Sequence, residues 1–397
     1  KVYDGNTTAV VSLTSDKLGS DVITITNTTA TFADKNVGVG KVVTVSGIAI
    51  TGTDAGNYSL TNVTATTNAD ITKKSLIVTA TAGQTKVYGA ADPTSYVYTL
   101  SPALITGDVL TGLLTRVTGE NIGTYAIGQG TLTNANYDIT YVGDNFTITP
   151  KALIITADNK SKVYGSVNPI LTFTYTGLAN GDVGTSTPPS ITTIVVVSSP
   201  VGTYSITISG ASDANYSISY VSGILSVTKK LLTITATAGQ AKVYGAVDPT
   251  SYVYTLSPAL VGSDVLTGAL TRATGENVGT YAIAQGTLTN ANYDITYVGS
   301  DFTITKKAIT VTATAGQTKV YGAADPASYT YTLSPALIGS DVLTGALTRA
   351  AGETVGAYAI TQGTLANANY DITYVGSDFT ITKKAITVTA TAGQAKV

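Results

Sequence analysis

The chain has 397 residues with a formal net charge of -2; 12% of them are charged and 43% are hydrophobic. It contains no His, Cys, Met or Trp, and therefore no imidazole base, no thiolate nucleophile and none of the usual zinc, copper or haem ligands. We expect no enzyme activity, cofactor or metal, no nucleic-acid binding for lack of a basic surface, and no membrane insertion, because no apolar run approaches ~20 residues.

A repeated string organises the chain. Lys-Val-Tyr-Gly recurs at intervals of 76 to 80 residues, and a related Lys-Val-Tyr-Asp-Gly opens the chain at Lys1. Each interval is longer than a solenoid repeat of ~20 to 50 residues and can fold by itself. We therefore expect domain boundaries that define repeat 1 (residues 1–74), repeat 2 (75–151), repeat 3 (152–229), repeat 4 (230–306) and repeat 5 (307–383), followed by the start of another repeat (384–397).

Within a repeat the hydrophobic period is two, which predicts half-buried strands. In repeat 4 the alternating segments are 232–236, 252–256, 281–283, 293–298 and 302–305. Turn-forming residues separate these segments, and only 262–268 has the composition of a helical turn, with Ser263 or Asp264 as its cap. We expect an all-β fold with at most one short helical turn per repeat, made of small β-sandwich-like or β-grasp-like domains.

The junctions between repeats lack a flexible linker. Residues 302–311 pass from the last strand of one repeat into the first strand of the next without Gly or Pro. Two lysines mark most junctions, as at Lys306 and Lys307, and we interpret them as solvated residues that protect exposed strand backbone from unwanted pairing. A stiff, elongated rod is the expected arrangement.

The recurring strings Lys-Val-Tyr-Gly, Asn-Tyr-Asp-Ile and Phe-Thr-Ile-Thr resemble the MBG domain of the Tyr-Gly-X type. Lys-Val-Tyr-Asp-Gly, with Asn57-Tyr58-Ser59-Leu60, is similar to the YDG domain. The resemblance covers essentially the whole chain. It implies tandem modules of very large bacterial surface proteins, including filamentous-haemagglutinin-like and gliding-motility adhesins, and it implies no catalytic residue. Repeat 3 departs most from the pattern, with Asn168-Pro169 in place of Asp-Pro and no matching Arg.

Pairs of tyrosines separated by one residue are the candidate binding residues. Residues i and i+2 of a strand point to one face, so each pair places two rings together. Such a face could stack on sugar rings, or it could pack a core or an inter-domain seam. The candidates are Tyr96, Tyr98, Tyr252, Tyr254, Tyr329 and Tyr331.

Other tyrosines are predicted to be structural. Tyr125, Tyr204 and Tyr281 each follow a Gly-Thr pair at a strand start, which resembles the tyrosine corner of sandwich folds. Tyr244, in the Lys-Val-Tyr-Gly string of repeat 4, is expected to be a buried ring in its own repeat, so that Tyr244→Ala unfolds that repeat.

Charged residues recur at fixed positions. Arg and Glu recur four residues apart, a spacing that makes residues neighbours on a helix but not on a strand. We interpret each Arg and Glu as a surface ion pair worth ~0 to 1 kcal/mol. The pairs are Arg116 and Glu120, Arg272 and Glu276, and Arg349 and Glu353. Calcium ligation by Asp92, Asp108, Asp138 and Asp144 is an alternative, but no Asp-x-Asp-x-Asp-Gly loop exists, and repeat 4, with Asp264, Asp294 and Asp301, is expected to be metal-independent.

The leading hypothesis is an extracellular stalk segment at a bacterial cell surface, which projects a distal binding region. Its partners are then neighbouring repeats of the same long chain. The alternative is a multivalent module with a weak glycan or protein receptor site in each repeat and affinity gained by avidity. An exposed tyrosine face in every repeat would favour the alternative, and a buried one would favour the stalk.

Overall fold

A computed structural model describes residues 1–391 and 393, and it confirms the all-β class. Part of the expected segment 384–397 thus lies outside the described residues. The described part contains one helix, the short 3-10 helix η1 (Ala55–Asn57). Residues 262–268 form a turn closed by a 3.1 Å hydrogen bond from Asp264 N to Val261 O, without a helix.

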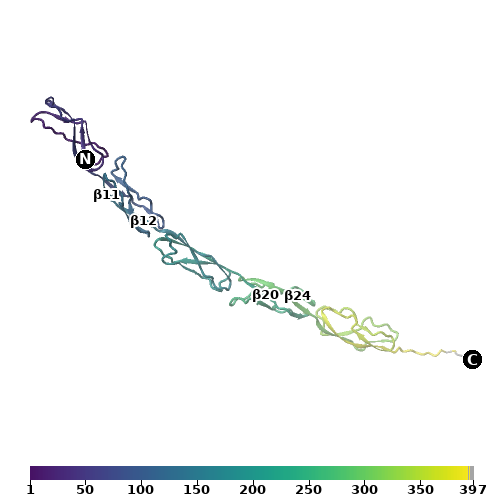
Figure 1. Ribbon diagram of the computed structural model, residues 1–397. Coiled ribbons are helices and arrows are strands. Elements are labelled where there is room, and N and C mark those ends of the chain that lie inside the picture. Colours follow the sequence, from purple (N-terminus) through teal and green to yellow (C-terminus); the bar gives the residue numbers. More distant parts are fainter. Residues whose placement is uncertain (392, 394–397) are drawn as a thin grey trace. The chain divides into compact units, whose positions relative to one another are not determined.

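Repeats 2, 4 and 5 contain the same seven strands in the same order. Figure 1 labels two strands of repeat 2 and two of repeat 4. Repeat 2 comprises β6 (Lys74–Ala80), β7 (Thr85–Val87), β8 (Tyr98–Ser101), β9 (Thr115–Arg116), β10 (Gly123–Gly128), β11 (Tyr137–Val142) and β12 (Asp144–Thr149). Repeat 4 comprises β20 (Lys230–Ala236), β21 (Gln240–Val243), β22 (Tyr254–Ser257), β23 (Thr271–Arg272), β24 (Gly279–Ala284), β25 (Tyr293–Val298) and β26 (Ser300–Thr305). Repeat 5 comprises β27 (Lys307–Ala313), β28 (Thr318–Val320), β29 (Tyr331–Ser334), β30 (Thr348–Arg349), β31 (Gly356–Thr361), β32 (Tyr370–Val375) and β33 (Ser377–Thr382).

Each of these repeats forms two sheets. In repeat 5 the three-stranded sheet has the order β29-β27-β32, and the four-stranded sheet has the order β28-β33-β31-β30. The central strand β27 pairs antiparallel with β29 and parallel with β32. Because β27 is the first strand after the junction, a new repeat places its first segment in the middle of a sheet.

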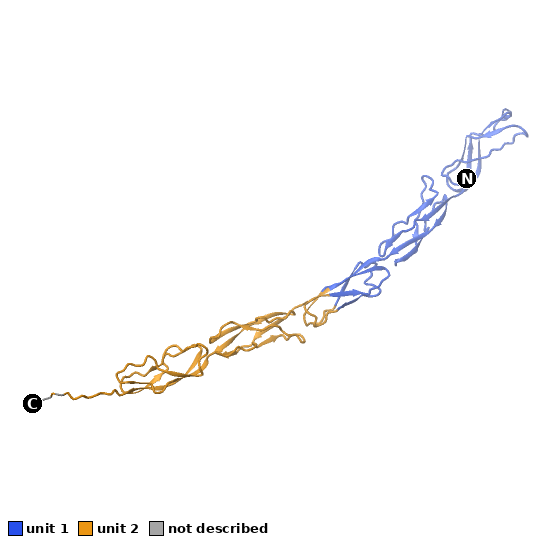
Figure 2. Cartoon of the chain, turned by 180° about the vertical axis from the view of Figure 1, so that it is seen from behind, with its two compact units in different colours: residues 1–159, 171–193, 205–223 blue, residues 160–170, 194–204, 224–397 orange. Residues whose placement is uncertain are grey.

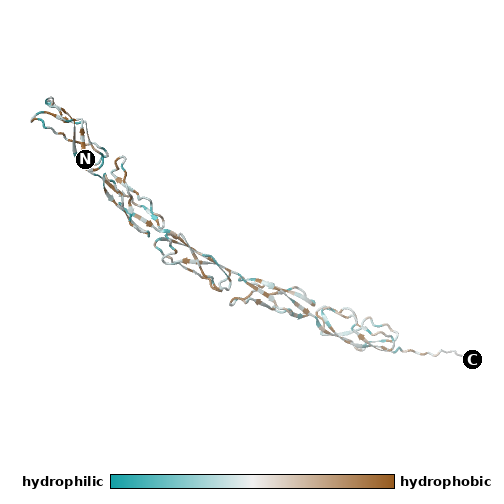
Figure 3. Ribbon diagram, in the orientation of Figure 1, coloured by the Kyte–Doolittle hydropathy of each residue, from teal (hydrophilic) through white to brown (hydrophobic). Residues whose placement is uncertain are grey.

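The two sheets enclose one apolar core. In repeat 5, Ile309 and Val311 of β27 pack in one cluster with Ile360 of β31 and with Phe379 and Ile381 of β33. Burial alternates along these strands, as the period of two predicts, and Figure 3 shows hydrophobic and hydrophilic residues interspersed along the strands. The sheets therefore face each other as the two layers of a small sandwich.

The chain divides into two compact units, coloured separately in Figure 2. Unit 1 contains residues 1–159, 171–193 and 205–223, and unit 2 contains residues 160–170, 194–204 and 224–397. Repeat 3 contributes to both units, with the sheet β15-β13-β18 in unit 1 and β14 paired with β19 in unit 2. Its strands are β13 (Lys151–Ala157), β14 (Lys160–Val163), β15 (Phe173–Thr176), β16 (Ser190–Thr193), β17 (Gly202–Ser209), β18 (Tyr216–Val221) and β19 (Gly223–Thr228).

Repeat 1 has fewer strands than the others. It comprises β1 (Thr24–Thr26), β2 (Thr29–Phe32), β3 (Gly38–Ser46), β4 (Ala49–Thr51) and β5 (Thr64–Ile71). They form a three-stranded sheet β2-β3-β5 and a two-stranded sheet β1-β4. Val2 bridges Thr72 in parallel, which places the opening string beside the last strand, as β7 lies beside β12 in repeat 2.

Candidate functional site

The tyrosine of the Lys-Val-Tyr-Gly string reaches out of its own repeat. Its backbone is held by the last strand of its own repeat, as in the 2.8 Å hydrogen bond from Tyr164 N to Thr228 O. The following glycine turns the chain with positive φ, +80° at Gly165. A Cβ built on Gly165 would lie 2.5 Å from Val261 Cγ2 of repeat 4, so the motif requires glycine both for its backbone and for the close approach of the next repeat.

The tyrosine ring enters the next repeat and donates to an aspartate there. Tyr164 Oη donates to Asp264 Oδ2 at 2.8 Å, and Tyr293 of repeat 4 donates to the same oxygen at 2.8 Å. The two rings meet edge to face, with centroids 5.7 Å apart. Val261 N in turn donates to Tyr293 Oη at 2.6 Å, which fixes the accepting turn.

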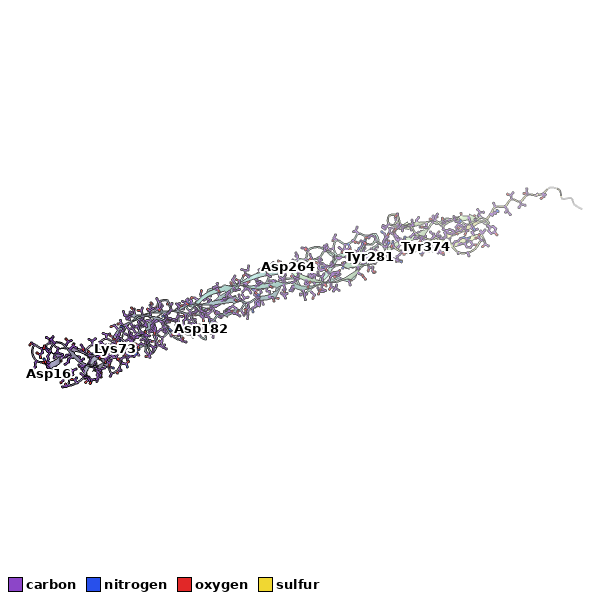
Figure 4. All side chains as sticks on the ribbon, turned by 90° about the horizontal axis from the view of Figure 1, so that it is seen from above. Asp16, Lys73, Asp182, Asp264, Tyr281 and Tyr374 are labelled. Carbon is purple, nitrogen blue, oxygen red and sulfur yellow. The ribbon has the colours of Figure 1, made fainter. Side chains whose placement is uncertain are left out.

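The same arrangement occurs at all four junctions of the described chain, and we call it the tyrosine joint. In every case the incoming tyrosine and a tyrosine of the receiving repeat share one carboxylate, and two of these carboxylates, Asp182 and Asp264, are labelled in Figure 4. The joints are Tyr3 with Asp108 and Tyr137, Tyr88 with Asp182 and Tyr216, Tyr164 with Asp264 and Tyr293, and Tyr244 with Asp341 and Tyr370.

An asparagine adds a second contact to each joint. Asn292, directly before Tyr293, accepts a 3.0 Å hydrogen bond from Val201 N of the preceding repeat. Equivalent bonds run from Val37 to Asn136, from Ile122 to Asn215 and from Val278 to Asn369. Each junction is thus held at two points, by a tyrosine ring and by a backbone hydrogen bond.

The neighbouring repeat, rather than its own, buries the joint tyrosine. Tyr3 and Tyr164 are 1% and 3% exposed, whereas Tyr321, at the same position of repeat 5, is 49% exposed. Tyr244 packs against the core of repeat 5. The expectation that Tyr244 is a core residue of repeat 4 is therefore wrong, because its ring fills a site on the next repeat.

The joint keeps its tyrosines neutral. Burial, followed by the hydrogen bond to Asp264, raises the pKa of Tyr164 to about 12, and burial with the Asp108 contact raises the pKa of Tyr3 to about 12. At neutral pH both hydroxyls therefore donate to the carboxylate. Asp108 is thus a joint residue, and Asp92 is held by Arg116; in the described part of the chain no three acidic residues gather as metal ligands.

A second recurring cluster lies inside repeats 2, 4 and 5, and we call it the charge network. In repeat 4, Arg272 contacts both oxygens of Asp248 through Nε at 2.9 Å and Nη2 at 3.1 Å, and it reaches Glu276 at 2.6 Å. Lys242 binds Asp248 at 2.7 Å and also contacts Glu276. The Arg272 guanidinium also lies over the rings of Tyr281 and Phe302, 5.1 and 5.6 Å from their centroids.

The interpretation of Arg and Glu as a surface ion pair is therefore wrong. The side chains of Arg272 and Lys242 are buried, while both carboxylates keep contact with solvent. The strand-and-turn path from Arg272 brings Glu276 back over the guanidinium, which the i, i+4 spacing alone does not show. The equivalent sets are Lys86, Asp92, Arg116 and Glu120, and Lys319, Asp325, Arg349 and Glu353.

Repeat 3 replaces the charge network with backbone acceptors. Lys162 donates to Val196 O at 2.7 Å and Ser166 O at 3.1 Å, and Asn168 donates to Val195 O at 2.6 Å. Burial lowers the pKa of Lys162, whereas in repeat 4 the hydrogen bonds to Asp248 and Glu276 outweigh burial and raise the pKa of Lys242. The sequence differences of repeat 3 thus change the partners of its buried lysine, and both of its tyrosine joints are kept.

The six candidate binding tyrosines are buried or half-buried in their own repeats. Tyr96 is buried against Phe146 and donates to Asp92, and Tyr252 and Tyr329 make the same pair of contacts in repeats 4 and 5. Tyr98, Tyr254 and Tyr331 are half-buried on β8, β22 and β29. Tyr329 and Tyr331 both pack against the core of repeat 5.

The predicted tyrosine corner is confirmed. Tyr125, Tyr204 and Tyr281 each donate to a backbone carbonyl four residues upstream, at 2.7 to 2.8 Å. In repeats 2 and 4 the corner ring also forms one wall of the charge network.

The charge network predicts loss of stability in acid. Hydrogen bonds from Arg272 and then Lys242 lower the pKa of Asp248 to about 2. A depressed folded-state pKa stabilises the fold above the ordinary value near 4, and this contribution is lost as the pH falls through about 2. Hydrogen exchange of repeat 4 should therefore accelerate between pH 4 and pH 2, after correction for the intrinsic rate. Asp248→Asn should exchange faster at pH 6 and lose most of the further acceleration; an unchanged acid profile in this variant would contradict the assignment.

These features define a tandem array of β repeats linked to one another by tyrosines that pack on the next repeat. The MBG domain of the YGX type matches residues 76–147, 153–226, 232–303 and 309–380, and the YDG domain matches residues 1–67. The chain belongs to the MBG domain (YGX type) family, which covers more than half of its length, and it carries a YDG domain at its start. No curated protein matches the chain. Neither domain type is enzymatic, and in the described residues no helix has the length and apolar character needed to cross a membrane.

Proposed function

We propose that the chain is a spacer segment of a very large secreted bacterial surface adhesin, in which tandem repeats hold a distal binding region away from the cell. MBG and YDG repeats are consistent with a module of surface adhesin-like proteins. The observation that carries the proposal is the tyrosine joint, which recurs with the same three side chains at four junctions although repeats 1 and 3 have diverged in sequence.

The chemistry of the joint suits a spacer. Each joint restricts the motion of one repeat against the next more than a covalent linker alone would. The restricting contacts are two hydroxyls on one carboxylate, an edge-to-face pair of rings and a hydrogen bond to an asparagine. Three of the six candidate binding tyrosines donate to Asp92, Asp248 and Asp325, and all six are buried or half-buried. Their burial supports a spacer over a multivalent receptor-binding module.

The test is to display the chain on a bacterial surface with a reporter binding domain at its far end, and to vary the number of copies of repeat 4. A spacer predicts that the reporter captures its ligand across a wider gap with each added repeat, and that the chain without the reporter does not adhere. If the bare chain adhered to glycan-coated or protein-coated surfaces, with avidity that rose with the number of repeats, the multivalent module would replace the spacer.

A further inference from the structure

Repeat 3 carries an apolar surface where repeats 2, 4 and 5 carry the charge network. Residues 166–170 lie beside residues 194–197, because Asn168 and Lys162 donate to backbone carbonyls of the second segment at 2.6 and 2.7 Å. Neither segment forms a strand. Five hydrophobic side chains of these two segments are between 44% and 86% exposed, and we call them the apolar patch: Val167, Ile170, Ile194, Val196 and Val197.

The corresponding positions of repeat 2 lie on one surface. A cavity of about 340 Å³ there is lined by Thr94 and Thr118, which come from the two corresponding loops. Thr94 and Ile170 stand at the same distance in sequence from the lysine of their Lys-Val-Tyr-Gly strings, and so do Thr118 and Ile194. Isoleucines in repeat 3 thus replace threonines that line a single cleft in repeat 2. The exposed side chains of the apolar patch are therefore neighbours, and such contiguous apolar surfaces are typical of interaction sites.

The chemistry of the apolar patch fits a second copy of the same patch. Residues 166–170 and 194–201 include no charged side chain. Two copies of the patch can therefore meet without bringing like charges together or taking a charge out of water. The corresponding loops of repeats 2, 4 and 5 each present an aspartate and a glutamate to solvent, and these carboxylates would repel their own copies. Among repeats 2 to 5, repeat 3 alone can pair with itself through this surface.

We propose that two copies of this chain pair through the apolar patch of repeat 3, patch against patch, about a two-fold axis. Removal of Ile170, Ile194 and Val196 from water drives the pairing. The described chain carries the patch once, so isologous pairing closes at two chains. Five side chains are few beside the ~20 to 30 residues that each partner contributes to a standard interface, so the pairing is weak in solution.

The pairing does not depend on the proposed spacer function. Only its extent at a cell surface rests on that function, because spacers anchored side by side raise the effective concentration of each patch for its neighbour. The mass of the chain in solution tests the pairing, whereas capture of a ligand across a gap tests the spacer. Either result can fail without the other.

The test is the mass of the full chain, measured by sedimentation over a concentration series that extends to the millimolar range. We expect a monomer–dimer equilibrium without larger species. Ile170→Asp combined with Ile194→Asp should weaken dimerisation at least tenfold, because each new charge would lose its water in the interface. Both side chains are more than four-fifths exposed and lie outside strands, so their replacement does not put folding at risk.

The matched control is Thr250→Asp combined with Thr274→Asp. These residues stand in repeat 4 at the positions of Ile170 and Ile194, and both are exposed. The control adds the same charge to the chain outside the apolar patch, so it should leave dimerisation nearly unchanged.

Disulfide trapping locates the interface. The chain has no Cys, so Ile194→Cys provides a single thiol in each copy. Because the patch is small, a two-fold pairing brings the two thiols close together. Under mild oxidation Ile194→Cys should therefore form a disulfide-linked dimer at least tenfold faster than Thr274→Cys, which places an exposed thiol at the same position of repeat 4.

Three results would overturn the proposal. A chain that stays monomeric throughout the series would exclude a second copy and leave a different protein as the occupant of the apolar patch. Dimerisation that Ile170→Asp with Ile194→Asp did not weaken would assign the interface to another surface. Weakened dimerisation without rapid trapping of Ile194→Cys would show that the patch binds a different surface of the second copy, which contradicts the two-fold pairing.

Discussion

Tyr244→Ala is expected to weaken the energetic coupling between repeats 4 and 5, while both repeats remain folded. The ring packs on the core of repeat 5, contacts Tyr370 edge to face at 5.5 Å and donates to Asp341 at 2.9 Å. Removal of a large ring from a packed site costs ~3 to 5 kcal/mol in a core. The ring of Tyr244 is only partly buried, so we expect a loss of about 2 to 3 kcal/mol in the coupling between the two repeats.

Tyr321→Ala is the matched control for this prediction. Tyr321 occupies the same position of a nearly identical repeat, but its ring is half exposed and no described repeat follows it. Its truncation should change stability by less than about 0.5 kcal/mol, as is usual for exposed sites. Calorimetry of the parent chain should show repeats 4 and 5 unfolding in one cooperative transition. This transition should divide into two in Tyr244→Ala and remain undivided in Tyr321→Ala. If Tyr244→Ala instead unfolded repeat 4 alone, the ring would be a core residue of its own repeat.

The strands were predictable from local sequence. A period of two in Thr, Val, Ile and Tyr identifies β20, β25 and β26, since side chains of a strand alternate between core and solvent. The tyrosine corner is local as well, because Tyr281 binds a carbonyl only four residues away. Both depend on contacts within a few residues, which a single sequence contains.

The tyrosine joint was not predictable in this way. Tyr164 and Asp264 lie 100 residues apart in different repeats, and a repeated sequence offers each tyrosine several identical aspartates. The Tyr-Gly string and the Gly-Ser-Asp turn were each visible, but no spacing links one to the other. The signal that could have found the joint is the glycine after the tyrosine, because an obligatory glycine indicates that another backbone or side chain approaches closely.

The charge network was misread for a related reason. Spacing suggested that Arg272 and Glu276 are surface neighbours, and the strand register hid the contacts of Arg272 with Asp248, 24 residues upstream, and with the ring of Phe302. An arginine becomes buried when side chains from other strands pack over it, and those strands are distant in the sequence. Only the packed fold shows that this guanidinium bridges two carboxylates beneath an aromatic cover.

Arg272→Ala is expected to destabilise repeat 4 by about 2 to 3 kcal/mol. The loss of one partner from a fully buried ion pair costs ~3 to 5 kcal/mol, and the effect is smaller here because Asp248 and Glu276 remain in contact with solvent. The cost also includes the packing of the guanidinium on Tyr281 and Phe302. Arg272→Lys keeps the charge but loses the two-pronged contact with Asp248, so it should recover only part of the stability.

Hydrogen exchange resolved by repeat measures this effect. Protection should fall in repeat 4 and remain unchanged in repeat 2, which has its own network around Arg116 and is separated from repeat 4 in the sequence by the whole of repeat 3. The sequence of repeat 3 supplies a natural comparison, since its Lys162 is satisfied by carbonyls without any arginine. The opposite result would be a free energy of unfolding of Arg272→Ala within about 0.5 kcal/mol of that of the parent. The network would then contribute no more than an exposed ion pair, and the rings over Arg272 would bury it without stabilising the repeat.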